Sequence, residues 1–421
     1  MMRIAMLTNN YKPFIGGVPI SVERLSESLR KLGHEVTVFA PEADGCGDDK
    51  FVVRYKILYQ QSEKGLVIGQ CFDKRIEQCF KERRFDVIHV HHPVLMGQTA
   101  LYLGKKYGIP VAYTYHTRYE EYLHYFRLYR EMDAGFYPLN RAAGYVKKRV
   151  VPRCMETFTN QCDLIFAPTG MMKDYLVKQG TRTRISVLPT GLDDSAFERN
   201  TERSGQIRAQ YLRHGDTWLF ATTARLEKEK NLEFLLRGIA RLKERAETCF
   251  RIMIIGDGTE RQNLERLSKQ LGIEDQVVFT GKLPNDQVRH YLNAADAFLF
   301  ASKSETQGIV LLEAMAAGCP VTAVKASGVS DVVKHGVNGY MTEEDENAWA
   351  ETIEQMMAEK SLYQALSQEA QRTAEGYRAN GIAKLAEHQY YKMIERKEEV
   401  EYEGMGKSMF MPSILRIFKT A

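Results

Sequence analysis

The sequence predicts an α/β protein in which two doubly wound domains, each built on a parallel sheet, follow one another. Short apolar runs alternate with amphipathic helical stretches, the runs are continuously apolar, and the series occurs twice in 421 residues. Such strands are typical of parallel sheets covered on both faces. The series restarts at Leu188-Pro189-Thr190-Gly191, so we expect one domain over 1–190 and the next over 191–380.

The strands expected in the first domain are Ile4–Thr8, Val36–Ala40, Asp86–Val90, Val111–His116, Leu164–Pro168 and Ile185–Leu188. Its first helix is expected over Val18–Leu32, where apolar residues recur on one helical face. The strands expected in the second domain are Trp218–Ala224, Arg251–Ile255, Val277–Thr280, Ala297–Ala301 and Val321–Val324. A last helix over 381–399 is expected to return and brace the first domain, followed by a tail to 421.

Composition excludes several classes of protein. Hydrophobic residues make up 44% of the chain, enough for substantial cores, and a net charge of +4 is too small for a nucleic-acid signature. The seven cysteines form no C-x-x-C pair, which favours a reduced, cytoplasmic location. The first residues have the pattern of a strand rather than of a signal peptide, and no 18 apolar residues run together.

The most informative motif is S-E-T-Q-G-I-V-L-L-E, which follows the fourth strand of the second domain. Eight helical steps would separate Glu305 and Glu313 by roughly 12 Å, comparable with the distance from hexose to ribose in a nucleotide sugar. A helix opens between them, and helix N-termini favour phosphate; its first amides are those of Gly308, Ile309 and Val310. The alternative is that the two glutamates are only a partner of the helix dipole and a solvated surface residue. However, Glu313 lies in an apolar run, where burying a carboxylate without partners costs several kcal/mol, and this favours a ligand-facing role.

Cations and glycines follow other strands. Arg225 and Lys230 come after the first strand of the second domain, where they can neutralise a diphosphate; a solvated charged turn is the alternative. Asn231 is expected to cap the next helix. Gly16 and Gly17 follow the first strand of the chain, and they fit a phosphate loop and an ordinary tight turn equally well.

Two further loops of the second domain are expected to shape a nucleotide pocket, although plain loops explain them too. The glycines of Gly256-Asp257-Gly258 permit close approach of a ligand, and Thr259 with Gln262 predicts a capping box. The main chain of Gly281-Lys282-Leu283-Pro284 can meet a base. The residues expected beside the nucleotide are therefore Asp257, Gly258 and Leu283.

Histidines cluster at strand ends of the first domain. His116 stands at the carboxyl end of its strand, where it can bond a sugar hydroxyl or fill a structural role. His89, His91 and His92 alternate between the faces of a strand, and no acidic or cysteine residue nearby has ligand spacing. We therefore predict no metal site there.

The segment Tyr113–Arg153 mixes aromatic residues, among them Tyr122, Tyr125, Phe126 and Phe136, with many cations. This mixture suits the interfacial zone of an anionic membrane, while a solvated helix face over core aromatics is the alternative. The residues expected to contact membrane or acceptor are Arg118, Tyr119, Lys147, Lys148, Arg149 and Arg153. The basic, apolar tail Ser408–Ala421 is a second expected contact.

E-T-Q-G-I-V-L-L-E, with Arg225 and Lys230, Gly16-Gly17 and His116, resembles family 4 of the retaining glycosyltransferases. The resemblance runs from Arg3 to about Gly339 and implies the GT-B architecture, two Rossmann-like domains facing a cleft. It implies that the C-terminal domain binds a UDP-sugar and that the N-terminal domain binds the acceptor. Front-face attack, in which the departing phosphate helps deprotonate the acceptor, then requires no side-chain nucleophile.

The resemblance also implies roles for single residues. It assigns the ribose to Glu313 and the transferred sugar to Glu305 and His116. It assigns sugar hydroxyls and phosphate to the amides of Gly308, Ile309 and Val310. It assigns the diphosphate to Arg225, Lys230 and the backbone of Gly17.

Within the family, D-V-I-H-V-H-H-P, Y-H-T-R-Y-E-E-Y and the E-T-Q-G variant resemble bacterial α-glucosyl-diacylglycerol synthases. These are peripheral membrane enzymes that transfer glucose from UDP-glucose to diacylglycerol. Many family members have Phe where this chain has Gln307. The resemblance implies a protein on the inner face of the cell membrane, with no tightly bound cofactor and no nucleic-acid partner.

Alternative functions remain open at this point. Transfer to a glycolipid or polysaccharide fits the same motifs, and nucleotide-sugar 2-epimerases share the fold without an acceptor. The basic aromatic segment favours a transferase, because an epimerase needs no lipid contact. The sequence leaves open the donor sugar, the acceptor, the oligomeric state and a requirement for a divalent metal.

Overall fold

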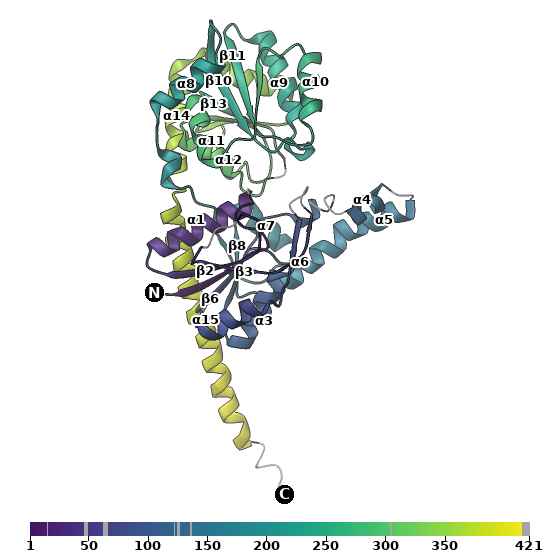
Figure 1. Ribbon diagram of the computed structural model, residues 1–421, viewed down its shortest axis with the longest axis vertical. Helices are drawn as coiled ribbons and strands as arrows, with labels where there is room; N and C mark the ends of the chain where they lie inside the picture. Colours follow the sequence, from purple (N-terminus) through teal and green to yellow (C-terminus); the bar gives the residue numbers. More distant parts are fainter. Residues whose placement is uncertain are drawn as a thin grey trace. The chain divides into compact units, whose positions relative to one another are not determined.

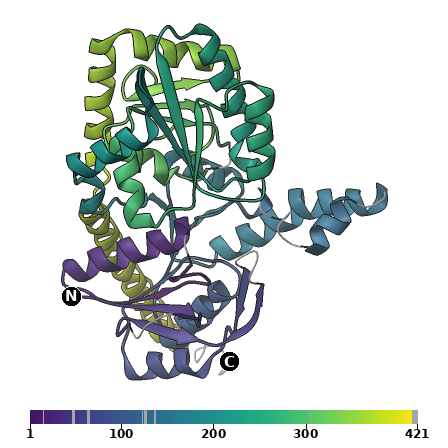
Figure 2. The same cartoon turned by 45° about the horizontal axis from the view of Figure 1, so that its top comes forward.

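The computed structural model describes residues 1–14, 16–45, 49–61, 66–121, 123, 127–134, 137–303 and 305–414. The chain divides into two compact units, drawn in Figure 1 and, from a second side, in Figure 2. Unit 1 comprises Met1–Pro168, Lys173–Leu188 and the chain from Ile382 onward; unit 2 comprises Thr169–Met172 and Pro189–Gly381. Each unit is a doubly wound α/β domain on a parallel sheet, which confirms the fold class that the sequence predicts.

The sheet of unit 1 has seven parallel strands in the order β3-β2-β1-β6-β7-β8-β9. They are β1 (Arg3–Leu7), β2 (Glu35–Pro41), β3 (Val52–Tyr55), β6 (Val87–Val90), β7 (Val111–Thr114), β8 (Leu164–Ala167) and β9 (Ile185–Val187). An antiparallel hairpin adds β4 (Ile57–Gln61) and β5 (Leu66–Gly69). The sequence does not predict β3, a half-buried edge strand whose apolar run is broken by Arg54.

The helices of unit 1 cover both faces of this sheet. They are α1 (Gly17–Lys31), α2 (Lys74–Glu82), α3 (Met96–Tyr107), η2 (Tyr119–Glu121), α4 (Arg127–Asp133), α5 (Tyr137–Tyr145), the π-helix η4 (Val146–Val150), α6 (Val151–Thr159), α7 (Gly170–Lys178) and α15 (Ala379–Ile414). Figure 1 and Figure 2 both show α4 and α5 standing out from the body of this unit.

The C-terminal helix α15 packs against the sheet of unit 1. Its apolar residues Ile382, Ala386, Tyr390 and Met393 recur at helical spacing and are buried in one cluster with β1, β2 and α1. This stripe explains why a segment distant in sequence returns to the first strands: the apolar face must be covered, and the faces of α1 and the sheet complete the same core.

The sheet of unit 2 has six parallel strands in the order β12-β11-β10-β13-β14-β15. They are β10 (Asp216–Thr223), β11 (Cys249–Ile255), β12 (Val277–Gly281), β13 (Ala297–Phe300), β14 (Val321–Val324) and β15 (Gly339–Thr342), the last not predicted from sequence. The helices are η5 (Asp194–Phe197), α8 (Thr201–Tyr211), η6 (Lys228–Lys230), α9 (Leu232–Arg245), α10 (Arg261–Gln270), α11 (Asn285–Ala294), α12 (Ile309–Ala316), α13 (Glu346–Ala358) and α14 (Lys360–Glu375).

Two apolar clusters sandwich this second sheet. One contains residues of α9, α10 and α13, and the other contains residues of α8, α11 and α12. Figure 1 shows the two sets of helices on opposite faces of the sheet. Because both faces are covered, β13 and β14 are buried along their whole length, which is why they read as continuous apolar runs.

The strand order of each sheet reverses once, between β1 and β6 in unit 1 and between β10 and β13 in unit 2. In open parallel sheets, ligands bind beyond the carboxyl ends of the strands at such a reversal. The loops after β10 and β13 therefore define the place to look for a site in unit 2.

Tyr390 provides a test of the packing of α15. Its hydroxyl lies 2.7 Å from Nδ1 of buried His89, so Tyr390→Phe should leave a buried imidazole nitrogen unsatisfied and destabilise unit 1 by about 1–3 kcal/mol. Hydrogen exchange of unit 1 amides measures the loss, and Tyr391→Phe, at a side chain 39% exposed, is the control. Both tryptophans, Trp218 and Trp349, lie in unit 2, so their fluorescence should report an unchanged transition.

Candidate active site

An ion pair joins the two loops at the strand reversal of unit 2. Lys230, at the end of η6, donates to Oε1 of Glu305 at 2.6 Å, and Ser302 donates to the same oxygen at 2.9 Å. The two charged side chains are only 13% and 19% exposed. Burial by itself raises the pKa of Glu305, but Lys230, Ser302 and the charge of Arg225 outweigh it and lower the pKa overall. Glu305 is therefore an ionised carboxylate paired with Lys230.

Arg225 lies in the loop after β10 and adds a second cation. Its guanidinium is exposed and pairs with Glu229 at 3.4 Å. The two side chains of this pair are 56% and 16% exposed, so the guanidinium is the part that faces solvent.

Asn231 corrects one expectation. It occupies the N-cap position of α9, but its side chain makes no cap; it donates instead to the carbonyl of Ala301 at 3.3 Å and to Glu344 at 2.8 Å. A left-handed backbone (φ 54°) turns the side chain away from the helix. The asparagine ties the loop after β10 to the end of β13, which supports the Lys230–Glu305 pair.

The helix α12 begins directly after this pair. Gly308 is its N-cap with φ +70°, a left-handed conformation that favours glycine, and no side chain caps the helix. The first-turn amides of Ile309 and Val310 have no acceptor within the helix, and such helix ends favour anions. Glu313 lies one turn further and is half-buried. Because Glu305 precedes the helix, the spacing of roughly 12 Å estimated from helical rise does not apply.

The glycines of the loop after β11 allow this loop to pack closely against a neighbouring loop. A Cβ on Gly256 would lie 1.9 Å from the carbonyl oxygen of Ala224, and one on Gly258 would lie 2.5 Å from that of Leu226. Leu226 also donates its amide to the carbonyl of Asp257 at 3.0 Å. The close approach in this structure is between this loop and the loop that carries Arg225.

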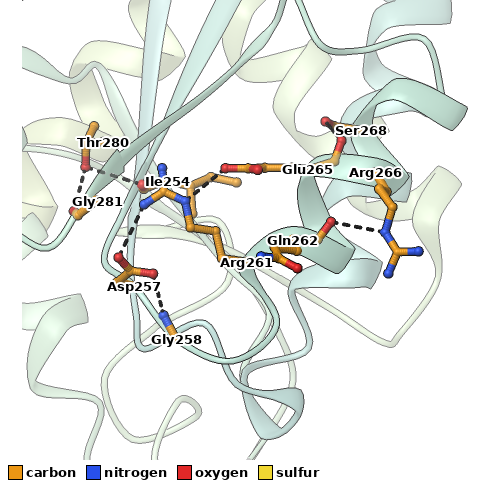
Figure 3. Close-up of polar contacts among 10 residues, drawn as sticks. All are labelled: Ile254, Asp257, Gly258, Arg261, Gln262, Glu265, Arg266, Ser268, Thr280 and Gly281. Carbon is orange, nitrogen blue, oxygen red and sulfur yellow. Dashed lines mark hydrogen bonds and ion pairs between the residues drawn. The ribbon is translucent and has the colours of Figure 1, made fainter.

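Arg261 organises the same region, as Figure 3 shows. Its guanidinium bonds Asp257 at 3.3 Å and Glu265 at 2.9 Å, while Asp257 accepts from the amide of Gly258 at 2.9 Å. The predicted capping box is wrong: the Thr259 hydroxyl donates to Glu227 at 2.7 Å and α10 starts after Glu260 without a side-chain cap. The longer reach of the Glu227 carboxylate across the loop outcompetes the local contact.

The loop that the sequence predicts to contact a base follows β12. Leu283 is half-buried and packs against the apolar cluster on one face of the sheet. Its neighbour Gly281 accepts a hydrogen bond from the amide of Gly256 at 3.0 Å. Asp257, Gly258 and Leu283 thus belong to adjoining loops at the carboxyl edge of β11 and β12.

In unit 1, Gly16 and Gly17 start α1 after the first strand. Gly16 is the N-cap in an extended conformation, without a side-chain cap. A Cβ at Gly16 would meet Pro19 at an ordinary 3.9 Å, so local packing alone does not demand glycine there. Close approach of a ligand to this loop is another reason for a glycine at this position.

His116 follows β7 and belongs to a stack of imidazoles. Its Nε2 lies 2.9 Å from Nδ1 of His91, and the rings are stacked. His91 in turn lies against His89, whose nitrogens contact Tyr390 at 2.7 Å and Thr114 at 2.6 Å. Burial lowers the pKa of His116 and of His91 well below the usual range, so both rings are neutral at pH 7.

The remaining histidine of the group, His92, accepts the amide of Asn9 at 3.1 Å, and burial lowers its pKa to about 4. In the part of the chain that the structure describes, no group of three or more His, Cys, Asp or Glu side chains is placed to hold a metal ion. The described contacts of these histidines include one another, hydroxyl and amide groups, and the ring of Phe166.

The residues expected at a membrane lie in two places. Arg118 bonds Glu120 at 3.1 Å and stacks over Tyr175, next to Tyr119 in η2. Lys147 bonds Glu121 at 2.9 Å and Arg153 bonds Glu156 at 2.6 Å, whereas Lys148 and Arg149 are exposed on η4. Exposed apolar side chains stand beside these cations: Leu139, Tyr145 and Val150. Tyr122, Tyr125, Phe126, Phe136 and tail residues 415–421 lie outside the described residues, and no described helix is long and apolar enough to span a bilayer.

Sequence reasoning did not find Ser302 as a partner of Glu305 or His91 as a partner of His116. Both contacts join residues that the fold brings together across a loop or between neighbouring strands. The register of β6 and β7, which pairs Ile88 with Val111, would have been needed to place His91 beside His116.

Comparison with known proteins agrees with this architecture. The model of glycosyl transferases group 1 matches residues 204–373, and that of glycosyltransferase family 4 matches residues 15–196. The chain is 29% identical over 406 residues to an alpha-monoglucosyldiacylglycerol synthase of Acholeplasma laidlawii, covering 94% of this chain and 99% of that protein. It is 30% identical over 337 residues to one of Streptococcus pneumoniae, covering 76% and 71%.

Solved structures share the fold at low identity. HepE of Anabaena, solved in complex with UDP, has a TM-score of 0.71 and 18% identity, over 93% of this chain and 100% of that one. A sucrose-phosphate synthase of Thermosynechococcus elongatus has a TM-score of 0.74 and 18% identity, over 94% and 100%. The fold and the matches define a glycosyltransferase of the GT-B architecture. The chain belongs to glycosyltransferase family 4.

The buried histidines predict how stability depends on pH. Burial lowers the pKa of His89 to about 3 and that of His92 to about 4, while an unfolded imidazole titrates near about 6.5. Between these values the unfolded chain binds protons that folded unit 1 does not. Stability should therefore fall as pH falls from about 6.5, by up to about 1.4 kcal/mol per pH unit for each histidine.

The free energy of unfolding of unit 1 in urea, with hydrogen exchange as the probe, should be compared at about pH 7 and about pH 5 to measure this loss. His89→Gln should be less stable at the higher pH but should lose less on acidification, because it removes one titrating group. Equal losses in the wild type and the variant would contradict a neutral, buried His89.

Proposed function

We propose that the protein is a retaining glycosyltransferase that moves a hexose, glucose in the first instance, from a UDP-sugar to a membrane lipid such as 1,2-diacylglycerol. The observation that carries the proposal is the buried Lys230–Glu305 pair at the strand reversal, directly before the open N-terminus of α12. The activity in the names of the two relatives supports a glucosyl donor and a diacylglycerol acceptor. HepE, which was solved with UDP-glucose as well, supports a uridine nucleotide.

The chemistry required of unit 2 is electrostatic. The bond that breaks joins the anomeric carbon to the β-phosphate oxygen, so negative charge grows on the departing diphosphate. Lys230, Arg225 and the first-turn amides of α12 are positive groups that stabilise it. Glu305 holds Lys230 in place before the donor arrives, which avoids reorganisation during the reaction.

The new bond joins the same carbon to the hydroxyl oxygen of the lipid, and the proton of that hydroxyl passes to the departing phosphate oxygen. The proposal keeps the roles implied by the resemblance: Glu313 at the ribose, His116 at the transferred sugar, Gly16 and Gly17 near the phosphates. A neutral His116 suits this role, because it can exchange hydrogen bonds with a sugar hydroxyl without adding a cation.

The location follows from the acceptor. We propose a peripheral protein on the inner face of the cell membrane, held by Lys148, Arg149 and the exposed apolar residues of α5 and η4. Each cation near an anionic surface contributes about 1 kcal/mol. Incubation with labelled UDP-glucose and diacylglycerol vesicles tests the function: an α-linked glucolipid supports it, and an isomerised nucleotide sugar without lipid product supports an epimerase instead.

Lys230→Ala should lower kcat/KM roughly 100- to 1,000-fold, because it removes the charge opposite the leaving group. Lys228→Ala is the matched control, since Lys228 is an exposed lysine of the same short helix η6. The variant also leaves the Glu305 carboxylate without its lysine, so the double variant Lys230→Ala/Glu305→Gln separates folding from catalysis. Recovery of activity in the double variant would argue against a catalytic lysine.

Lys148→Gln/Arg149→Gln should weaken partition onto anionic vesicles by about 2 kcal/mol, roughly 30-fold, at low salt. Co-sedimentation with vesicles of rising anionic lipid content measures it, and the difference should shrink as salt screens the charges. Lys173→Gln/Lys178→Gln removes the same charge from exposed positions of α7. Equal losses in both variants would mean that only net charge matters and that η4 is not the contact.

A further inference from the structure

Gln307 lies inside the loop between Glu305 and the start of α12, and its side chain is buried at 4% exposure. The oxygen and the nitrogen of its side-chain amide both form hydrogen bonds with the backbone of Thr190. Oε1 accepts from the amide of Thr190 at 2.7 Å, and Nε2 donates to the carbonyl of Thr190 at 3.0 Å. The side chain thus copies the paired hydrogen bonds of adjacent β-strands.

Thr190 is itself firmly placed within unit 2. The next residues pair with the segment that leaves this unit: Leu192 donates to Tyr377 at 2.7 Å and accepts from Ala379 at 2.8 Å. A Cβ on Gly191 would lie 2.5 Å from Cα of Ala379, so the two backbones are in direct contact. The partner of Gln307 is therefore a rigid backbone rather than a mobile loop.

The other side of the same loop rests on Gly328. A Cβ there would lie 2.7 Å from the carbonyl oxygen of Glu305 and 2.9 Å from the carbonyl carbon of Thr306. The loop is therefore held between the backbone of Gly328 and the backbone of Thr190. One contact is steric and the other is a pair of hydrogen bonds from Gln307.

We propose that Gln307 is a positioning residue for donor binding: its amide, paired with Thr190, sets the loop so that Glu305 meets Lys230 and α12 starts in register. The inference rests on the proposed function, in which this loop binds the nucleotide sugar. Gln307 does not itself touch the substrate. It acts by holding the pair and the first-turn amides in their bound arrangement before the ligand arrives, which lowers the ordering cost of binding.

The chemistry of an amide is specific here. A glutamate carboxylate at 307 would turn an acceptor toward the carbonyl of Thr190, whereas a protonated carboxyl offers one donor and one acceptor, as glutamine does. Burial raises the pKa of such a group above about 4.3. Gln307→Glu should therefore work better in acid. Gln307→Met fills similar volume and removes both bonds at every pH.

The experiment compares these variants with the wild type between about pH 5 and pH 8 and measures kcat, donor KM and UDP affinity by calorimetry. The charged side chains of Glu305, Lys230 and Arg225 at this loop are present in every protein compared, so each variant is divided by the wild type at the same pH. We expect Gln307→Met to raise donor KM at least tenfold at all pH values. We expect Gln307→Glu to approach the wild type as pH falls. Gln287→Met, at an exposed position of α11, is the control.

Each outcome decides the proposal. Wild-type donor KM and UDP affinity in Gln307→Met overturn it, as does an equal loss in Gln307→Glu and Gln307→Met at every pH. A Gln307→Glu protein that matches the wild type throughout, beside an impaired Gln307→Met, supports it, because the buried carboxyl then stays protonated. If the wild type transfers no sugar, the proposed function fails. Faster hydrogen exchange at the Thr190 amide in Gln307→Met would then still support the hydrogen bonds between Gln307 and Thr190. Unchanged exchange would reject them.

Discussion

The ion pair between Lys230 and Glu305 is the interaction on which the site of unit 2 depends. Two largely buried charges are costly unless each satisfies the other, and removing one partner costs about 3–5 kcal/mol. The fold supplies the geometry by reversing its strand order between β10 and β13, so that the loops after these strands are neighbours. Ser302 and Asn231 add hydrogen bonds that tie the same two loops together. The charge pair is thus a consequence of topology, held by local polar contacts.

Backbone packing, more than side chains, shapes the loops around this pair. Gly256 and Gly258 allow the loop after β11 to lie against the loop that carries Arg225, and Gly328 allows the loop after β14 to lie against Glu305. A Cβ at any of these positions would come within 3 Å of backbone atoms. The glycines that resemble ligand-binding signals are required first by the contact of one loop with another. Any approach to a nucleotide is built upon that packing.

The sequence predicted the parts of the molecule that follow from local pattern. Buried strands such as β13 and β14 read as apolar runs, and the helix predicted to open at Gly308 is α12. The half-buried edge strand β3 and the final strand β15 were missed, because their residues do not form a clear run. The partners of Gln307 and of His116 depend on residues far away in the chain or on strand register, which periodicity does not encode. The side chains of Asn231 and Thr259 donate to the distant carboxylates of Glu344 and Glu227 instead of forming the local helix caps that the sequence predicted.

The charges of the two units differ in a way that suits the proposed reaction. In transfer of a glycosyl group the sugar ring gains positive character while the leaving phosphate gains negative charge. A cation beside the ring would oppose the first change, whereas cations beside the phosphate favour the second. Burial keeps the imidazoles of His116 and His91 neutral, so that they can bond hydroxyls without charge, whereas Lys230 lies 2.6 Å from the Glu305 carboxylate. Burial disfavours the charged form of both kinds of group, and at Lys230 the carboxylate of Glu305 opposes that effect.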